Sequence, residues 1–171
     1  MTRKPNPRKG DKAIARGENR ALIRRYYDEL WNEWNLGVAD EIISTEITFR
    51  GSLAVTVSGL NGFKSYVTLV RNAFPDFHNT IEEMIAEGDR VAARLTYRAT
   101  QRGELFGIAP TGREVTYAGA AMFRIRSGKI VHGWVLGDTL GLLRQLGAGP
   151  AQGSGSFEAG VASAGSRPGP R

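Results

Sequence analysis

The apolar residues of this chain change their spacing half-way along it, and that change limits the folds open to it. In the first half they recur every three or four residues, which is the period of an amphipathic helix. The clearest such stripe consists of Leu22, Ile23, Tyr26, Tyr27, Leu30, Trp31 and Trp34. In the second half apolar and polar residues alternate, as they do in half-buried strands. Helices followed by a run of strands predict an α+β fold with the helices packed on one face of a curved, mostly antiparallel sheet.

The turn signals divide this pattern into elements. We expect helices over 18–35, 38–44, 58–74 and 139–147, with Gly37 ending the first and Pro75 ending the third. A strand is expected over 46–52. Two hairpins follow, and their turns are predicted at 87–89 and 126–129. The segment 104–112, between the hairpins, is expected to be a loop.

Alternation within the strands indicates which residues share a face. Val91, Ala93, Leu95, Tyr97 and Ala99 lie on one face of their strand, while the opposite face is too polar for a dry core. The next strand has small residues on both faces, which leaves room for a cavity or for close packing against a neighbour. A curved sheet closed by helices forms a cone, whose interior is a natural pocket for a flat apolar ligand.

Composition limits the domain organisation. The chain has 171 residues with a net charge of +6, and part of that charge lies in its ends. We expect residues 1–17 to be a disordered basic arm, 18–147 the folded domain and 148–171 a disordered tail rich in Gly, Ala, Ser and Pro. The arm lacks aromatic residues, so nucleic acid is not an expected partner. The absence of cysteine fits a reducing cytoplasm, and no apolar run is long enough to span a membrane.

Several segments resemble one known family when taken together. They are "FPDF" after the third helix, "AEGDRVAAR", "GELFGIAPTGR", "GKIV" and "DTLGLLRQLG". Over about residues 18–147 the chain is similar to the SnoaL-like polyketide cyclases, also called ester cyclases. The resemblance implies an NTF2-like cone, a homodimer or larger homo-oligomer, a small polyketide-like substrate and ring closure by intramolecular aldol chemistry without a cofactor.

The resemblance also assigns an acid/base residue, Asp138, at the end of the last strand. An aldol closure requires a base for the proton between two carbonyl groups, and an apolar setting could raise the pKa of a carboxylate for that task. Trp134, Leu136 and Leu140 could provide that setting. The spacing alone suggests a simpler role, because Asp138 directly precedes a helix and aspartate is a favoured N-cap residue. The two roles are compatible.

The residues that would support this aspartate differ from the family pattern. Histidine is common in the family at the positions of Arg50 and Gln101, and histidine or an aromatic residue at the position of Gly133. Arg50 could stabilise an oxyanion or lie at the surface of a strand end. His132 would share a strand face with Trp134 and could polarise a substrate carbonyl, provided the strand has no bulge.

Further residues are candidates for binding the substrate or for core packing. They are Trp134, Tyr27, Trp31, Phe63, Tyr97, Tyr117, Phe106 and His78. No metal-binding spacing of His, Asp or Glu is evident. Other enzymes on this fold remain alternatives, including a dehydratase and an epoxide hydrolase, for which Glu104 or Glu114 would supply a second carboxylate. A non-catalytic ligand-binding domain is a third alternative, and its signature would be a pocket filled by side chains with Asp138 turned to solvent.

Overall fold

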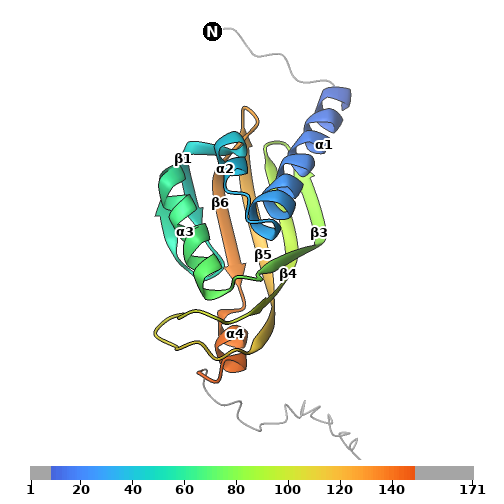
Figure 1. Cartoon of the computed structure of the whole chain (residues 1–171). Coiled ribbons are helices and arrows are strands. Elements are labelled where there is room, and N and C mark those ends of the chain that lie inside the picture. The colour runs from blue at the N-terminus through green and yellow to red at the C-terminus, as the bar shows by residue number, and fades with distance from the viewer. Residues whose placement is uncertain (1–8, 149–171) are drawn as a thin grey trace, which may run out of the picture.

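A mixed sheet of six strands forms the framework of the computed structural model (Figure 1). The structure describes residues 9–148. The strands are β1 (Ile43–Arg50), β2 (Thr56–Ser58), β3 (His78–Glu87), β4 (Arg90–Thr100), β5 (Glu114–Arg126) and β6 (Lys129–Gly137). Their order across the sheet is β2-β1-β6-β5-β4-β3, and only the β1–β6 pair is parallel.

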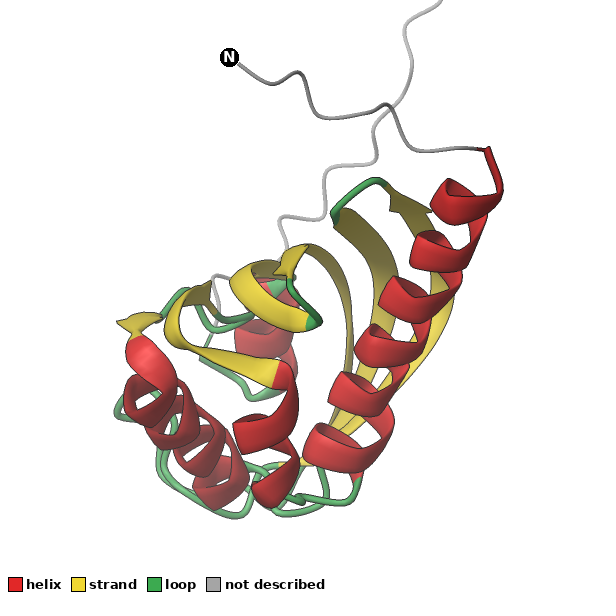
Figure 2. Ribbon diagram, turned by 90° about the horizontal axis from the view of Figure 1, so that it is seen from above, coloured by secondary structure: helices red, strands yellow, loops and turns green. Residues whose placement is uncertain are grey.

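Three helices pack on one face of this sheet: α1 (Lys9–Arg25), α2 (Gly37–Ile42) and α3 (Gly59–Ala73). The short α4 (Thr139–Gln145) follows β6 and contacts β5 at the end of the sheet (Figure 1). Directly after α1 the chain continues as a π-helix, η1 (Tyr26–Asn32). Figure 2 shows α1 along the β3–β4 side of the curved sheet and α3 along the β1–β2 side. We call the face that α1, α2 and α3 cover the inner face, and the opposite one the outer face.

The alternation expected in the second half is confirmed. Val91, Ala93, Leu95 and Tyr97 are all buried on the inner face, while Ala92 and Arg94 between them are exposed on the outer face and Thr96 is half-buried. The two hairpins are also confirmed, with turns between β3 and β4 and between β5 and β6. The expected α+β class, with helices on a curved and mostly antiparallel sheet, is therefore the observed one.

Neighbouring aromatic rings fill the space beside the small residues of the inner face. A Cβ atom added to Gly119 would lie 2.3 Å from the Tyr97 ring, and one added to Gly133 would lie 2.6 Å from the Phe49 ring. Both distances are far shorter than a van der Waals contact. Of the two readings that the sequence left open, close packing against a neighbour is the correct one at these positions.

Two boundaries near the N-terminus differ from expectation. Helix α1 begins at Lys9, so residues 9–17 are helical and the prediction of a disordered arm is wrong for them. Gly37 does not end the first helix: η1 ends at Asn32, and Gly37 is the first residue of α2. The chain reverses between them at Trp34, whose φ of 56° is unusual for a residue other than glycine. The rest of the expected arm and tail, residues 1–8 and 149–171, lies outside the described residues.

Candidate functional site: the aromatic interior and the outer face

The interior of the cone contains a small cavity of about 20 Å³. Its walls come from η1, β1, the segment after β1, α3, β3, β4 and β6. The lining residues are Tyr26, Tyr27, Trp31, Phe49, Ser52, Tyr66, Phe77, Asn79, Tyr97 and Val135. A space of this size holds about one water molecule. In this conformation the interior is therefore a packed cluster of aromatic rings.

The phenols in this cluster are held in their neutral form. Burial raises the pKa of Tyr26 and Tyr27 well above the ordinary value of 10. Burial likewise raises the pKa of Tyr66, Tyr97 and Tyr117. At neutral pH these side chains are hydrogen-bond donors that keep their protons, so they can bind a carbonyl or enolate oxygen but cannot act as bases.

The buried part of the described chain contains no carboxylate or imidazole. Its buried polar side chains are Ser52, Asn79, Thr100 and Gln101. A charged group in this interior would pay a large desolvation penalty without a partner. A ligand admitted to this interior would therefore have to be neutral.

Several of the sequence-predicted binding residues belong to this interior. Tyr27, Trp31 and Tyr97 line the cavity. Tyr117 packs against Tyr97, with ring centroids 4.9 Å apart. Phe63 is fully buried behind the cavity wall, where it packs edge-to-face on Phe49.

Asp138 lies at the end of β6 as the N-cap of α4. Its Oδ1 accepts a hydrogen bond from the backbone N–H of Gly141 at 2.8 Å. The carboxylate is exposed, and so are Leu136 and Leu140, which were expected to shield it from water. The apolar setting predicted for Asp138 is therefore absent, and the capping role suggested by spacing is the observed contact.

The other residues proposed to act with Asp138 also lie on the outer face. Arg50 donates a hydrogen bond to the Val135 carbonyl at 2.6 Å, and its guanidinium stacks over the Trp134 ring at 5.5 Å. His132 is exposed two residues before Trp134. The structure brings Arg50, His132 and Trp134 together, but on the opposite side of the sheet from the cavity.

A bulge in β6 explains this placement. Counting away from the turn between β5 and β6, Arg126 pairs with Lys129 and Ile125 pairs with Ile130. The next residue of β5, Arg124, pairs with His132. Val131 is the extra residue. A one-residue slip turns every following side chain to the other face of the sheet. No bulge separates His132 from Trp134, so the two share a strand face as expected, but the bulge before His132 turns that face away from the cavity.

The outer face also carries an apolar groove. It has a volume of about 400 Å³ and is bounded by residues of β3, β4, β5 and β6. Ile85, Met122 and Trp134 provide apolar surface there, and His132 lies at its side. Ile85 and Met122 are 59% and 57% exposed, which is unusual for large apolar side chains. We call this surface the outer groove.

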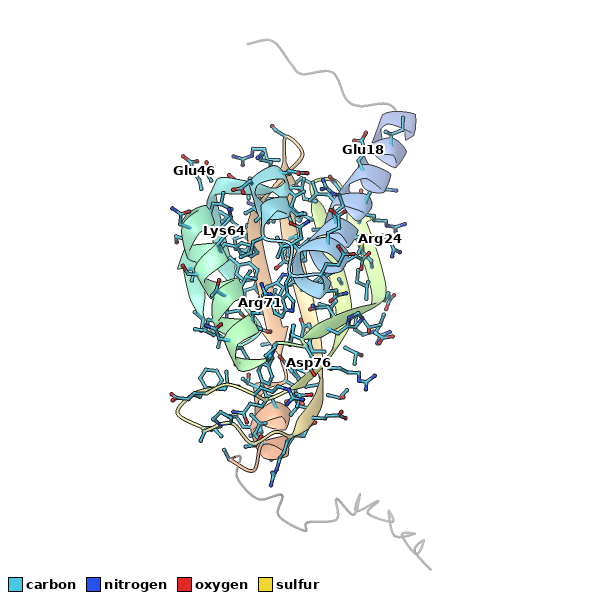
Figure 3. The ribbon with its side chains drawn as sticks, viewed as in Figure 1. Glu18, Arg24, Glu46, Lys64, Arg71 and Asp76 are labelled. Atoms are coloured by element: carbon cyan, nitrogen blue, oxygen red, sulfur yellow. The ribbon has the colours of Figure 1, made fainter. Side chains whose placement is uncertain are left out.

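His78 lies in a separate polar hollow of about 180 Å³ at the far end of β3, β4 and β5. Arg98, Glu114 and Asp76 line the same hollow, and Figure 3 places Asp76 between the body of the sheet and the region of α4. Partial burial alone would raise the pKa of Asp76. Hydrogen bonds from the hydroxyl and amide of Thr100 outweigh burial and lower that pKa below its usual range.

The loop between β4 and β5 is organised by a residue whose role sequence reasoning missed. Gln101 is fully buried, its amide nitrogen donates to the carbonyls of Gly103, Ile108 and Ala109, and its Oε1 accepts from the amide and hydroxyl of Thr111. A glutamine between a strand and a Gly/Pro-containing loop was the only signal for this. The loop carries Phe106 outward, 53% exposed and away from the cavity residues.

No group of three or more His, Asp or Glu side chains within residues 9–148 is placed to hold a metal ion. In the same range, each helix lacks the length or the apolar character that a membrane crossing needs.

Comparisons with known proteins agree with this architecture. The structure of AclR, a proposed hydroxylase from Streptomyces galilaeus, is 32% identical, with 80% of this chain and 89% of AclR covered at a TM-score of 0.70. IdmH, a proposed polyketide cyclase from Streptomyces antibioticus, is 28% identical, with 75% and 98% covered at a TM-score of 0.66.

A proposed SnoaL-like polyketide cyclase from Jannaschia sp. CCS1 shares the fold at 20% identity, with 85% and 100% covered and a TM-score of 0.73. No curated protein matches the chain significantly. The family model of the SnoaL-like polyketide cyclases matches residues 21–146, which span α1 to α4. The cone, its aromatic interior and this match together show that the chain belongs to the SnoaL-like polyketide cyclase family.

Proposed function

We propose that this protein closes a ring in a polyketide-like substrate by an intramolecular aldol addition inside the cone. The observation that carries the proposal is the interior itself, which combines flat aromatic walls with neutral phenol donors and has no buried charge among the described residues. Such walls suit a flat aromatic substrate, and such donors suit its carbonyl oxygens. Membership of the cyclase family supports the same reaction class.

The phenols would act on the oxygen that becomes negative as the proton leaves carbon. Preorganised donors in a site without water stabilise an enolate more strongly than water does. Because the raised pKa of Tyr27 and Tyr97 keeps both hydroxyls protonated, they can donate to that oxygen throughout neutral pH. This role needs no charged residue in the interior.

Asp138 is the proposed base. It follows Gly137, whose added Cβ would lie 2.9 Å from the Ser52 carbonyl, and Ser52 lines the cavity. The aspartate is thus one residue from the inner wall, although its carboxylate points to Gly141 in this conformation. In the proposal Asp138 leaves its cap when substrate enters, and His132 and Arg50 remain on the outer face.

The proposal includes a homodimer in the cytoplasm, formed through the outer groove. A two-fold dimer would place the exposed Ile85 and Met122 of this groove in the interface on both subunits and remove them from water. The same dimer would also shield Trp134 and His132 from water.

The test compares Asp138→Asn with Asp138→Ala. Asparagine caps a helix as well as aspartate does, so Asp138→Asn should keep the stability of the wild-type chain, whereas Asp138→Ala should lose about 1 kcal/mol. Ring closure is followed on a neutral aromatic β-keto ester whose side-chain ketone can form a six-membered ring. We expect both variants to lose at least about 100-fold in kcat. Wild-type turnover by Asp138→Asn would leave Asp138 with the capping role alone.

A non-catalytic ligand-binding domain is the second candidate function. Two observations favour it: side chains fill the interior down to about 20 Å³, and Asp138 faces solvent. That candidate predicts saturable binding of the same keto ester without any ring closure above the buffer rate. Turnover by the wild-type chain would exclude it.

A further inference from the structure

The hydroxyl of Tyr27 has no partner in the packed interior. The side chain is fully buried, it lines the cavity, and none of the described residues accepts or donates a hydrogen bond there. Trp31 Nε1 and Tyr117 Oη are less isolated, since they face the hydroxyls of Tyr26 and Ser52, but neither reaches hydrogen-bond geometry. A buried donor left unpaired destabilises the folded state, so such groups are rare in native proteins.

Tyr66 provides the contrast within the same cavity. It is also a buried tyrosine, but its hydroxyl lies 3.5 Å from the Ser52 hydroxyl and accepts from the Leu53 amide at 3.4 Å. The interior therefore does contain partners for phenols. The isolation of Tyr27 is a property of its position on η1.

The helical turn that carries Tyr27 is itself unusual. Tyr26–Asn32 is a π-helix between the α-helix α1 and the chain reversal, and such turns are frequent at functional sites. Trp34, two residues beyond it, has a φ of 56°, a conformation that costs energy for a bulky residue. Trp34 is held by stacking with Arg71 and by a hydrogen bond from its indole to the Pro75 carbonyl. Strain and the unpaired hydroxyl therefore occur on one segment.

We infer that Tyr27 is the interior donor that recognises an oxygen of the ligand, and that η1 is the wall that moves to admit a flat, neutral, carbonyl-bearing ring system. The inference rests on the proposed function, because it takes the interior to be the substrate chamber. Ligand entry would give the Tyr27 hydroxyl an acceptor. It would also widen a cavity that holds about one water molecule in the packed state.

The experiment compares Tyr27→Phe with Tyr66→Phe in the full chain, with the methyl ester of anthraquinone-2-carboxylic acid as the ligand. Phenylalanine keeps the ring and removes only the hydroxyl. Without ligand, Tyr27→Phe should raise Tm by about 2–6 °C because an unpaired donor is gone. Tyr66→Phe should lower Tm because it removes a partnered hydroxyl. Calorimetry should show Kd about 10-fold or more weaker for Tyr27→Phe and within about 3-fold of wild type for Tyr66→Phe.

Hydrogen exchange tests whether η1 moves when the ligand binds. Binding should change the exchange of the peptide covering residues 26–34 in the wild-type chain and leave that of α3 unchanged. A Tm that falls in Tyr27→Phe, a Kd that does not change, or a wild-type chain that fails to bind the anthraquinone would each overturn the inference. Ring closure by Asp138 is measured separately. A wild-type chain that binds the anthraquinone through Tyr27 but closes no ring in the keto ester would refute the proposed function and leave this inference standing.

Discussion

Gly119 decides how deeply the Tyr97 ring enters the interior. Since an added Cβ would overlap that buried ring, Gly119→Ala should force the ring to move and destabilise the fold by about 1–3 kcal/mol. The measurement is the free energy of unfolding in urea. Gly17→Ala is the matched control, because Gly17 lies in α1 with open space around its Cα and should gain about 0.5–1 kcal/mol of helix stability. Equal effects of the two substitutions would show that the packing at Gly119 does not matter.

Asp76 links the stability of the fold to pH. Its pKa in the folded protein is lowered, chiefly by hydrogen bonds from Thr100 that outweigh partial burial. A lowered pKa stabilises the folded state above the ordinary carboxyl pKa of about 4, and that contribution is lost as the pH falls through the folded value. As the pH is lowered from 6 to 2, the urea concentration at the midpoint of unfolding should therefore fall more steeply for the wild-type chain than for Asp76→Asn. Parallel curves would show that Asp76 does not contribute.

At the scale of elements, η1 is tied to the sheet by one side chain. Asn32 accepts from the backbone amide of Asn79 at 2.8 Å and from its side-chain amide at 3.1 Å, and it donates to the Asn79 carbonyl at 3.0 Å. These bonds fix the end of η1 on β3. They are the contacts that would limit how far η1 can move.

Asn32→Ala should therefore destabilise the fold by about 1–3 kcal/mol and leave the buried polar groups of Asn79 unpaired. Hydrogen exchange of residues 26–34 should become faster, while that of α3 should not. The exposed neighbour Glu33 provides the control, as Glu33→Ala should change neither quantity. Unchanged exchange in Asn32→Ala would show that η1 is anchored elsewhere.

The sequence predicted whole elements more reliably than the faces they present. Alternation predicted which residues share the buried face of β4, and turn residues predicted both hairpins, because these signals are local. A regular register from the turn would have paired Phe123 with His132 and turned His132 inward. The bulge at Val131 pairs Phe123 with Gly133 instead, and a bulge follows from the packing of the whole sheet. The π-helical form of η1 could not be predicted for the same reason, because it too depends on the packing of the whole molecule.

At the scale of the whole molecule, the outer groove is the surface that a second copy would cover. Met122 lies in it with 57% of its surface exposed, so Met122→Asp would place a charge in the proposed interface. Light scattering after gel filtration should give a dimer for the wild-type chain and a monomer for this variant. Leu69→Asp is the control, since Leu69 is an exposed apolar residue on α3. A wild-type monomer, or a dimer in Met122→Asp, would contradict the proposed interface.

We propose that the cone interior, and not the outer groove, receives a flat oxygen-bearing ligand. A crystal structure with the anthraquinone methyl ester bound tests it most directly. We expect ligand density between η1 and the inner face of β4 and β6, with a ligand oxygen within hydrogen-bond distance of the Tyr27 hydroxyl. Ligand in the outer groove beside Trp134, with the interior still packed, would contradict it.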